Sequence, residues 1–480
     1  MPDHKRHATE IVHTLRESGH QAYFAGGCVR DLLLSRDPAD YDVATDATPR
    51  QVIEIFPQTL AVGEQFGVVL VPFKADTTKD HEGDEPARTD SFEGRVVPGT
   101  MGASGKQRYL FLPPSLRKSV EVATFRSDLG YSDGRHPDEV RFTKDPREDV
   151  QRRDFTINGM MLDPATNEIL DFVGGRADLK AGIIRAIGDP NRRFAEDKLR
   201  MLRAVRFAAR FDYQIDPATL AAIRKLAPQI RQVSSERVRE ELTKMLTEGR
   251  ASRAFALLDT SGLLPEVLPE IAAMKGVEQS PEYHPEGDVF VHTLLLLEKL
   301  PPNSSKTLAW GALVHDVGKP PTFRVAPDRI RFDGHVEVGV KMAAEICRRL
   351  RFSNDETDQI LALVENHMRF ADVLRMKQST LKRFLRLPAF DEHLELHRLD
   401  CLSSHGQLDA YEYSREQSHS MPPESIRPTP LISGRDLIEA GYEPGPRFKE
   451  VLSAVEDAQL EGRLSSREAA IEYVRREFPL

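Results

Sequence analysis

Short apolar runs alternate with helix-like segments near the N-terminus of the chain. The runs 21–25 and 66–72 have the length and apolar content of strands. Residues 29–34 and 49–56 have the pattern of short helices, and Thr48 stands before the second one as a favoured N-cap, followed by proline. This alternation predicts a small α/β unit.

A polar stretch then interrupts the pattern. Residues 74–106 contain glycine and threonine without any periodicity, which indicates an inserted loop. Strand-like runs resume at 109–112 and 119–125. We therefore expect the insert to occupy about 74–118 within the α/β unit.

The pattern is helical almost throughout from about residue 192, with no persistent β alternation after Ala186. A proline-rich stretch at 421–430 indicates a linker before a last helical unit. The sequence therefore predicts an α+β fold, in which a small α/β head with a mixed sheet precedes a long, all-helical neck and body. The predicted units are a head at 1–190, a helical neck at 191–265, a helical body at 266–420 and a C-terminal helical unit at 421–480.

Composition narrows the class of protein. The chain has 480 residues, 40% hydrophobic and 29% charged, enough for roughly two to four domains. No apolar run approaches the length of a membrane span, and the N-terminus lacks a signal-peptide core. The three cysteines are too far apart for a disulfide framework, so we expect a cytoplasmic protein. The net charge of -9 argues against indiscriminate coating of nucleic acid, but it allows a local basic groove.

The first chemically informative segment follows the first predicted strand. Gly26 and Gly27 allow a backbone to approach phosphates closely, and Arg30 follows on the next turn. Asp40 and Asp42 are two residues apart, so on a strand their carboxylates point to the same face. Two such carboxylates suit Mg²⁺ held against a triphosphate. A glycine pair or an Asp-x-Asp alone is usually a turn or a cap, but their order and closeness indicate a nucleotidyl-transfer site.

Two later segments add charged groups of the same kind. Glu121 lies on a predicted strand between apolar neighbours and supplies a third carboxylate, although such a residue is usually a half-exposed strand glutamate. Arg153 and Asp154 offer a phosphate-binding fork and an acceptor for a ribose hydroxyl. The alternative is a salt bridge in an exposed loop.

Residues 195–207 have the pattern of an amphipathic helix. Asp197 and Arg200 are three residues apart and are expected on a common face, which Arg203 and Arg206 continue. An acceptor beside a donor fork matches the hydrogen-bonding edge of a nucleobase, and the further arginines would meet nucleotide phosphates. A salt-bridged solvent face is the alternative.

The first half of the chain carries, in this order, the segments GGCVRD, DYDVAT, EVATFR, RRDFTIN, EDKLRMLRAVRF and SSERVREEL. This series resembles the tRNA nucleotidyltransferases of the bacterial and eukaryotic class, the CCA-adding enzymes, and their relatives the bacterial poly(A) polymerases. The resemblance implies that the head is a nucleotidyltransferase domain. The chain departs from the family in its longer insert and in Gly159, where the family often has alanine.

The resemblance also implies a role for each residue. Gly27 and Arg30 would contact the triphosphate, while Asp40 and Asp42, with help from Glu121, would hold Mg²⁺. The other implied nucleotide contacts are Arg153, Asp154 near the ribose, the template pair Asp197 and Arg200 that reads cytosine or adenine, and Arg203 and Arg206 beside it. Residues 235–241 match a helix that braces the template.

The second half of the chain has its own series of metal-ligating residue types. A lone histidine on an apolar helix is usually a core residue, but imidazoles and carboxylates in this order suit one or two divalent metals. The series is His292, His315, Asp316, His335, His367 and Asp400. It resembles the HD phosphohydrolase superfamily, which implies an HD-type helical domain with a second divalent metal site.

HD modules accompany the nucleotidyltransferase in one branch of the CCA-adding family. There they resemble phosphatases or phosphodiesterases that act on 2′,3′-cyclic phosphates or 2′-nucleotides, although an HD fold can also serve mainly to hold RNA. Residues 431–462 resemble the tail of such enzymes. The basic clusters 348–351 and 382–386 can contact tRNA phosphates, although a solvated helix face is the more common role of such clusters.

We therefore predict Mg²⁺-dependent, template-independent addition of C, A or both to tRNA 3′ ends, with tRNA, CTP and ATP as partners. The 3′-hydroxyl would attack the α-phosphorus, and pyrophosphate would leave. One rival is a poly(A) polymerase, or an enzyme that adds only CC or only A. Another is an HD metal-dependent phosphohydrolase whose head only binds nucleotide. A tRNA-binding scaffold is disfavoured, because such charged clusters are costly to place without metals. The HD metal and the oligomeric state stay open.

Overall fold

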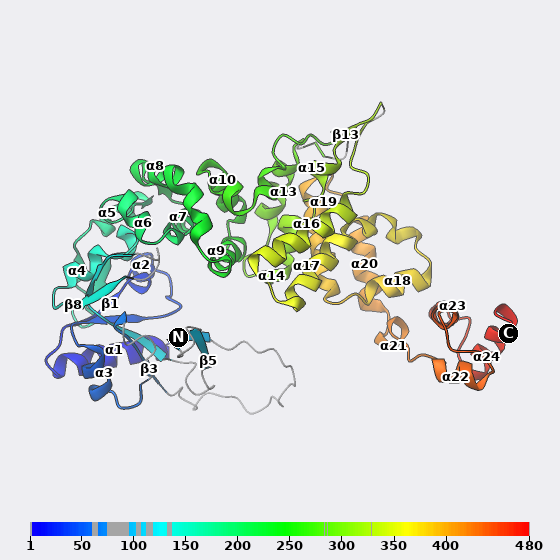
Figure 1. Ribbon diagram of the computed structural model, residues 1–480, viewed down its shortest axis with the longest axis horizontal. Helices are drawn as coiled ribbons and strands as arrows, with labels where there is room; N and C mark the ends of the chain where they lie inside the picture. Colours follow the sequence, from blue (N-terminus) through cyan, green and yellow to red (C-terminus); the bar gives the residue numbers. More distant parts are fainter. Residues whose placement is uncertain are drawn as a thin grey trace. The chain divides into compact units, whose positions relative to one another are not determined.

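The computed structural model confirms the predicted α+β fold, with a mixed sheet near the N-terminus and helices after it (Figure 1). The chain divides into two compact units. Unit 1 is Met1–Ser234 with Ser261–Leu263, and unit 2 is Ser235–Thr260 with Leu264–Leu480. The four predicted domain ranges stay predictions. The structure describes residues 2–59, 66–73, 96–101, 107–111, 119–131, 137–282, 284–285, 287–327 and 329–479.

A six-stranded mixed sheet forms the centre of unit 1, in the order β10-β9-β1-β2-β6-β3. Within it β2 and β6 are parallel, and the other neighbouring pairs are antiparallel. The predicted strands near the N-terminus and at 119–125 are therefore present. The strands are β1 (Ala22–Ala25), β2 (Asp42–Thr45), β3 (Val68–Pro72), β6 (Ser119–Thr124), β9 (Met160–Leu162) and β10 (Ile169–Asp171).

The sheet has an apolar core on one face and helices against it. Ala25, Ala44 and Met161 share a buried cluster with Phe125 and Val150. Helices α1 (Pro2–Glu17) and α3 (Pro49–Ile55) pack against each other and against the sheet. The predicted cap of α3 is present, since Thr48 and Gln51 form a capping box. The other helices of this part are α2 (Gly27–Leu33), α4 (Pro146–Gln151), η4 (Thr156–Asn158) and α5 (Gly175–Ala181).

The insert is not a plain loop. Strands β4 (Val96–Met101) and β5 (Gln107–Phe111) pair antiparallel as a separate two-stranded sheet, so the loop prediction was wrong for β4. Proline and glycine within β4 hide its strand pattern in the sequence. The rest of the 74–118 insert lies outside the described residues. A second hairpin pairs β7 (Arg126–Leu129) with β8 (Glu139–Phe142).

The predicted helix over 195–207 is two helices. α6 (Pro190–Glu196) ends at Asp197, whose backbone is extended with φ -143° and ψ 107°, and α7 (Leu199–Phe211) follows. The Asp197 carboxylate accepts a hydrogen bond from the backbone N–H of Leu199 at 3.1 Å, because a short acidic side chain competes for backbone donors at a helix start. Unit 1 also contains α8 (Pro217–Leu226), η5 (Ala227–Gln232) and the short pair β11 (Ile183–Ile184) and β12 (Gln214–Ile215).

Unit 2 is helical except for one short hairpin, β13 (Arg324–Val325) with β14 (Ile330–Arg331), among the residues described. This agrees with the predicted helical body. No helix in the described part of the chain is long and apolar enough to cross a membrane. The helices are α9 (Ser235–Thr247), α10 (Ala251–Thr260), α11 (Leu264–Val267), α12 (Pro269–Ala272), α13 (Val289–Lys299), α14 (Lys306–Val314), α15 (Lys319–Thr322), α16 (His335–Leu350), α17 (Asn354–Asn366), η6 (His367–Arg375), α18 (Gln378–Leu385), α19 (Phe390–Ser403), α20 (Asp409–Ser420), α21 (Pro423–Ile426), α22 (Gly434–Glu439), α23 (Arg447–Leu460) and α24 (Arg467–Glu477).

The basic residues of the cluster at 382–386 form hydrogen bonds and ion pairs with another helix of unit 2. Arg383 and Arg386 both bond to Glu456 on α23, at 2.6 and 2.7 Å, and Lys382 donates to the carbonyl of Leu460 at 2.7 Å. These contacts dock the C-terminal helices on α18. The cations are therefore engaged within the protein, which does not favour the tRNA contact considered for this cluster.

The basic cluster at 348–351 is also paired. Arg348 bonds to Glu345 at 2.6 Å, and Arg349 forms a two-pronged pair with Glu270. Arg351 lies 3.3 Å from Glu236. The ordinary role of a salt-bridged helix face accounts for this cluster as well.

Candidate functional site

The turn after β1 needs a glycine at position 26 for two reasons, its positive φ and the close approach of a neighbouring side chain. Gly26 has φ +77°, and its N–H donates to the carbonyl of Met160 at 3.2 Å before α2 begins at Gly27. A Cβ on Gly26 would lie 3.1 Å from Nη1 of Arg153. Glycine thus permits the backbone conformation and lets a guanidinium approach the turn. The turn and Arg153, predicted separately, lie side by side.

Sheet register brings two of the predicted carboxylates together. Val43 on β2 pairs with Val122 on β6 in parallel, so the residues before them, Asp42 and Glu121, occupy neighbouring positions. Neighbouring parallel strands are about 4.8 Å apart, and residues in register share a face. Asp42 also lies directly opposite Ala25, at the end of β1. Asp42 is therefore beside the glycine turn, and Glu121 is one strand further along the sheet.

Asp40 is placed differently from the prediction. It precedes β2 in an exposed segment, whereas Asp42 begins the strand and is half-buried. In the described residues, the compact three-ligand groups with donor atoms within 4.8 Å of one another are both in unit 2. Asp40, Asp42 and Glu121 are not such a group, and the feature that favours a cation here is the register that sets Asp42 next to Glu121.

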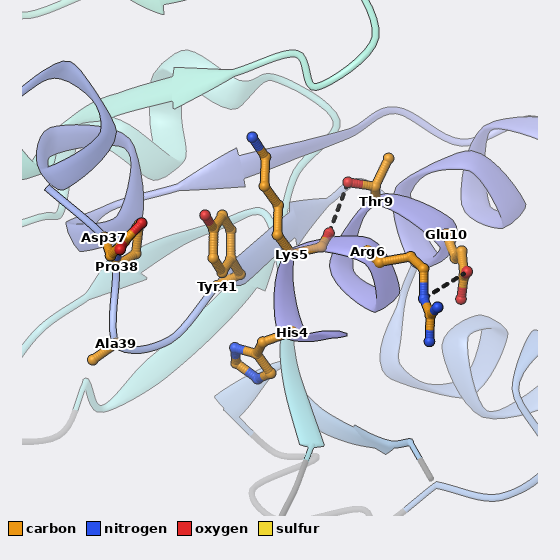
Figure 2. Close-up of a pocket in the computed structure, with 9 residues that line it drawn as sticks. All are labelled: His4, Lys5, Arg6, Thr9, Glu10, Asp37, Pro38, Ala39 and Tyr41. Atoms are coloured by element: carbon orange, nitrogen blue, oxygen red, sulfur yellow. Dashed lines mark hydrogen bonds and ion pairs between the residues drawn. The ribbon is translucent and has the colours of Figure 1, made fainter. Parts of the chain in front are cut away.

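A cavity of about 540 Å³ lies beside the segment that carries Asp40, between that segment and the first turns of α1 (Figure 2). Arg6 pairs with Glu10 at 3.8 Å along this wall, and Tyr41 is buried at the other side. The lining residues are His4, Lys5, Arg6, Thr9, Glu10, Asp37, Pro38, Ala39 and Tyr41.

Asp149 organises the two adjacent arginines. Its Oδ1 accepts from Nη2 of Arg152 at 2.6 Å, and its Oδ2 accepts from Nη2 of Arg153 at 2.9 Å. Burial alone would raise the pKa of Asp149, but the attraction of Arg152 and Arg153 outweighs it and lowers the pKa. Arg153 is therefore held by its Nε and Nη2, while its Nη1 faces Gly26.

Asp154 is the centre of a second network. Its Oδ2 accepts from Nε and Nη2 of Arg203 at 2.9 and 2.6 Å, and its Oδ1 accepts from Nδ2 of Asn158 at 3.0 Å. Burial opposes ionisation, but the charge of Arg203 and the hydrogen bonds from Asn158 and Arg203 lower the pKa of Asp154 to about 2. The carboxylate is charged and fixed at neutral pH.

Arg30 is buried, with an exposed fraction of 4%. Its Nε donates to Asp31 at 2.9 Å, and its Nη1 donates to Asn158 at 2.7 Å. Its guanidinium carbon lies 4.6 Å from the ring centre of Phe211 and 5.3 Å from that of Phe207. A Cβ on Gly27 would lie 3.6 Å from its Nη2, so the guanidinium lies against the glycine turn, and the triphosphate contact that the family resemblance implies stays a prediction.

The predicted template pair is divided between two elements. Asp197 lies at the break between α6 and α7, so the expected single helix was wrong. The N–H of Arg200 donates to the Asp197 carbonyl at 3.1 Å, and the common face of the two side chains stays a prediction. Arg200 donates to Glu196 at 3.0 Å and to the carbonyl of Arg152 at 3.0 Å. Glu196 also accepts from Arg193 at 2.6 Å. This buried glutamate was missed by the sequence reasoning, although its spacing from Arg193 and Arg200 by three and four residues is a usable signal.

The remaining arginines lie along α7. The guanidinium carbons of Arg203 and Arg206 are 5.2 and 4.4 Å from the ring centre of Phe207. Arg206 is buried, whereas Arg203 is partly exposed.

The glycine at position 159, where the family often has alanine, has a packing reason. A Cβ on Gly159 would lie 2.8 Å from Cγ2 of Val173, so there is no room for the alanine side chain in this arrangement.

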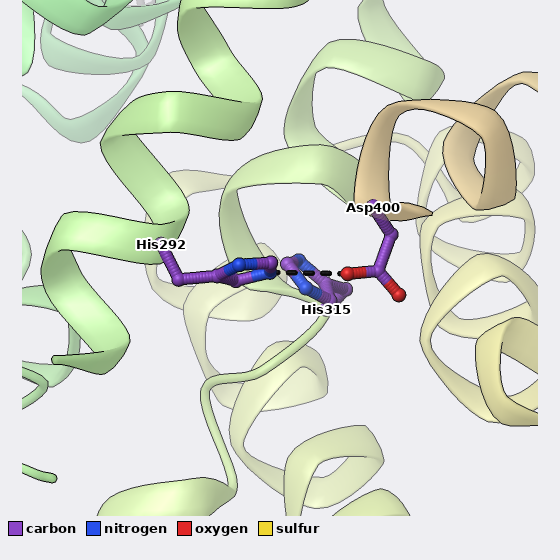
Figure 3. Close-up of side chains that lie close together, drawn as sticks. All are labelled: His292, His315 and Asp400. Atoms are coloured by element: carbon purple, nitrogen blue, oxygen red, sulfur yellow. Dashed lines mark ion pairs between the residues drawn. The ribbon is translucent and has the colours of Figure 1, made fainter. Parts of the chain in front are cut away.

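The structure brings all six predicted HD residues together in unit 2. His292, His315 and Asp400 form one compact group, with Nε2 of His292 3.1 Å from Asp400 (Figure 3). Asp316, His335 and His367 form a second group. Oδ2 of Asp316 lies 3.2 Å from His315, and its Oδ1 lies 3.8 Å from His367. Asp316 therefore connects the two groups.

The histidines are oriented as metal ligands. Nδ1 atoms of His315, His335 and His367 lie 2.9, 3.0 and 2.7 Å from backbone carbonyls, which can only accept, so these nitrogens carry the proton. Their Nε2 atoms are buried without a hydrogen-bond partner among the described residues. Burial lowers the pKa of His367 to about 4, which keeps its imidazole neutral. Imidazole Nε2 atoms that face carboxylates in a buried site fit divalent transition metals.

Close backbone packing makes this centre possible. A Cβ on Gly318 would lie 2.1 Å from the carbonyl oxygen of His335 and 2.6 Å from the backbone nitrogen of Gly339. Only glycine lets α16 approach the segment that carries His315 and Asp316.

Lys319 and Gln279 were missed by the sequence reasoning. Nζ of Lys319 lies 2.7 Å from Oδ2 of Asp316 and 2.6 Å from Oε1 of Gln279, and both side chains are buried. Burial would raise the pKa of Asp316, but Lys319 and His315 hold it well below the ordinary range. Lys319 is only three residues after Asp316, and this spacing could have predicted their contact. No sequence spacing connects Gln279 to them, because only the fold brings it to Lys319.

Three family descriptions match successive parts of the chain. The poly A polymerase head domain matches residues 22–91 and 99–185. A probable RNA and SrmB-binding site of polymerase A matches 212–275, and the HD domain matches 288–388.

Full-length relatives and solved structures agree with this order. The CCA-adding enzyme of Lactobacillus helveticus is 30% identical over 478 residues, covering 98% of this chain and 97% of that protein. The one from Bacillus licheniformis is 28% identical over 468 residues, covering 97% and 96%. The crystal structure of the Bacillus stearothermophilus CCA-adding enzyme in complex with CTP is similar with a TM-score of 0.69 and 27% identity, covering 99% and 98%. A Thermotoga maritima CCA-adding enzyme complexed with tRNA has the same fold, with a TM-score of 0.55 and 18% identity over 98% and 94%.

Proposed function

Because this chain belongs to the family of CCA-adding enzymes, we propose that it adds C and A to the 3′ ends of tRNA, using CTP and ATP without a nucleic-acid template. The observation that carries the proposal is the register of Asp42, which lies opposite the residue before the glycine turn and next to Glu121 on the neighbouring strand. A terminal hydroxyl of the RNA attacks the α-phosphorus of the nucleotide, a P–O bond forms, and pyrophosphate leaves.

Asp42 and Glu121, with Asp40 before the strand, are the residues that would hold Mg²⁺. When bound, Mg²⁺ supplies charge neutralisation at the triphosphate. The glycine turn offers a close backbone approach to the phosphates, and Nη1 of Arg153 lies beside it. Asp154 stands near the ribose, and Asp197 and Arg200 read the base, with Arg203 and Arg206 alongside. Catalysis by this chain is then mostly positioning.

The test uses a tRNA trimmed of its terminal CCA, incubated with CTP alone, ATP alone and both together. Sequencing of the ends should give CC with CTP and complete CCA with both. A long A tract with ATP alone contradicts the proposal and favours a poly(A) polymerase. An end that stops at CC, or a gain of A only on a CC-ended tRNA, indicates a partial activity. The Asp42→Ala variant is the inactive control.

We propose a second activity in unit 2, the metal-dependent hydrolysis of a phosphoester such as a 2′,3′-cyclic phosphate. The observation in its favour is the convergence of three inward Nε2 atoms and two carboxylates. The metal supplies Lewis-acid activation when bound, and Lys319 offers a cation beside Asp316. His315→Ala should abolish hydrolysis of 2′,3′-cyclic nucleotides and leave incorporation of CTP intact. If Asp42→Ala abolishes hydrolysis instead, the assignment to unit 2 is wrong.

A cytoplasmic location is also part of the proposal. The three cysteines are free and buried, which suits a reducing compartment.

A further inference from the structure

A closed ring of contacts joins the glycine turn to α7. Arg30 on α2 bonds to Asn158, Asn158 bonds to Asp154, and Asp154 bonds to Arg203 on α7. The ring closes because Arg30 also lies over two aromatic rings of α7. The members of this positioning ring are Arg30, Asn158, Asp154, Arg203, Phe207 and Phe211.

Bonds to Asp31 and Asn158 occupy three of the five guanidinium N–H donors of Arg30. Its Nε and Nη2 are 2.9 and 2.8 Å from Asp31, its Nη1 is 2.7 Å from Asn158, and its side chain is buried. A Cβ on Gly27 would lie 3.6 Å from Nη2 of Arg30, so the guanidinium already lies against the glycine turn. Turning it toward a triphosphate as its main partner would still compete with its bonds to Asp31 and Asn158, which is costly. The same bonds make Arg30 a rigid connection between α2 and α7.

Asn158 is the connecting member. Its Oδ1 accepts from Arg30, and its Nδ2 donates to Asp154, so one amide fixes both charged groups. Asp154 in turn receives two bonds from Arg203, three residues after Arg200 on the same helix. A displacement of Asn158 would therefore shift the ribose-side carboxylate and the helix that carries the base-reading arginine.

We infer that Arg30 and Asn158 are positioning residues that set α7 against the glycine turn and thereby determine which nucleotide is accepted. The inference rests on the proposed nucleotide addition. It assigns to Arg30 a role in specificity in place of triphosphate binding. Misplacement of a recognition element by a fraction of an ångström to about 1 Å can cost roughly a hundredfold in rate, so the effect is large enough to measure.

The experiment compares the full chain with Asn158→Ala and Arg30→Lys, since lysine keeps the charge but cannot bridge Asp31 and Asn158. Arg36→Ala is the matched control, because the Arg36 guanidinium carbon also lies 5.2 Å from the Phe211 ring centre but takes no part in the ring. Phe211→Leu tests the aromatic contact with little change in volume. Thermal unfolding selects variants that keep the fold.

Two readouts separate the roles. The first is the ratio of kcat/KM for CTP over UTP on trimmed tRNA, and the second is inhibition by inorganic tripolyphosphate. We expect the kcat/KM ratio of CTP over UTP to fall roughly tenfold or more in the ring variants. Their inhibition by tripolyphosphate should stay within about twofold of that of the parent chain. Arg36→Ala should change neither the ratio nor the inhibition. Weaker tripolyphosphate inhibition with an unchanged ratio would overturn the inference and restore Arg30 as a phosphate ligand. An unchanged ratio and unchanged inhibition would overturn it too. Failure of the parent chain to incorporate CTP would instead refute the proposed function itself.

Discussion

Arg203 donates two hydrogen bonds to a single carboxylate oxygen of Asp154, from Nε at 2.9 Å and from Nη2 at 2.6 Å. These bonds connect the RRDFTIN segment to α7. They also bring together two groups that lie 49 residues apart in the sequence. The pairing holds a buried carboxylate in its charged form.

This pair gives a pH dependence with a definite sign. The pKa of Asp154 is lowered from about 3.8 to about 2, so the pair stabilises the folded state above about pH 4 and loses that contribution as pH falls toward 2. The shift corresponds to about 2 kcal/mol. We expect Arg203→Met to lower the free energy of unfolding at neutral pH by an amount that shrinks at about pH 3. Urea unfolding at the two pH values measures it, and a difference that is the same at both would contradict this origin.

The carboxylates of the head should be essential for nucleotide addition but not for unit 2. Asp42→Ala removes the carboxylate that lies opposite Ala25 and beside Glu121, so incorporation of CTP should fall by roughly a thousandfold or more. Asp37→Ala, on the exposed segment before Asp40, is the control. Single-turnover incorporation measures the effect. Full activity of Asp42→Ala would remove the catalytic role of this edge of the sheet.

Three strands of the large sheet were predictable from the sequence, because short apolar runs are a local pattern. Apolar runs predicted β1, β3 and β6, and the last of these runs placed Glu121 on a strand. The two-residue spacing of Asp40 and Asp42 predicted a shared strand, but only Asp42 lies on β2, and its pairing with Glu121 comes from the sheet register. The break at Asp197 was not predictable from periodicity, because it depends on competition between one side chain and the backbone.

Tertiary contacts account for the other differences. The burial of Arg30 depends on Asn158 and Phe211, which are far away in sequence, and no spacing rule connects them. The HD residues were predictable as a set, since their types and order carry the signal. Their division into two groups connected by Asp316, and the presence of Gln279 beside Lys319, come from helix packing alone.

The metal centre of unit 2 should depend on each inward histidine. His335→Ala or His367→Ala removes one proposed ligand of the group that contains Asp316. It should weaken binding of Mn²⁺ or Ni²⁺ by at least the roughly ten- to hundredfold that loss of a group supporting a ligand costs. The exposed His405→Ala is the control. Calorimetric titration of the metal-stripped full chain measures affinity independently of any enzymatic activity. Equal metal affinity in all three variants would argue against a metal centre at these residues.

Close backbone packing at Gly318 gives a separate prediction. Gly318→Ala would place a Cβ within 2.1 Å of the carbonyl of His335, so α16 must move and the centre should lose metal affinity, with a stability cost of roughly 1–3 kcal/mol. Gly445→Ala is matched, because a Cβ there meets nothing within 4 Å. Metal titration and thermal unfolding of both variants give the comparison. Unchanged metal affinity in Gly318→Ala would mean that the approach of α16 is not needed for the centre.

Sequencing of the tRNA ends after reaction of trimmed tRNA with CTP and ATP decides whether this chain adds CCA. We expect a single product that ends in CCA, with no extension beyond it, and no product from Asp42→Ala. A heterogeneous tail of adenosines, or product formation by Asp42→Ala at the parent rate, would contradict it.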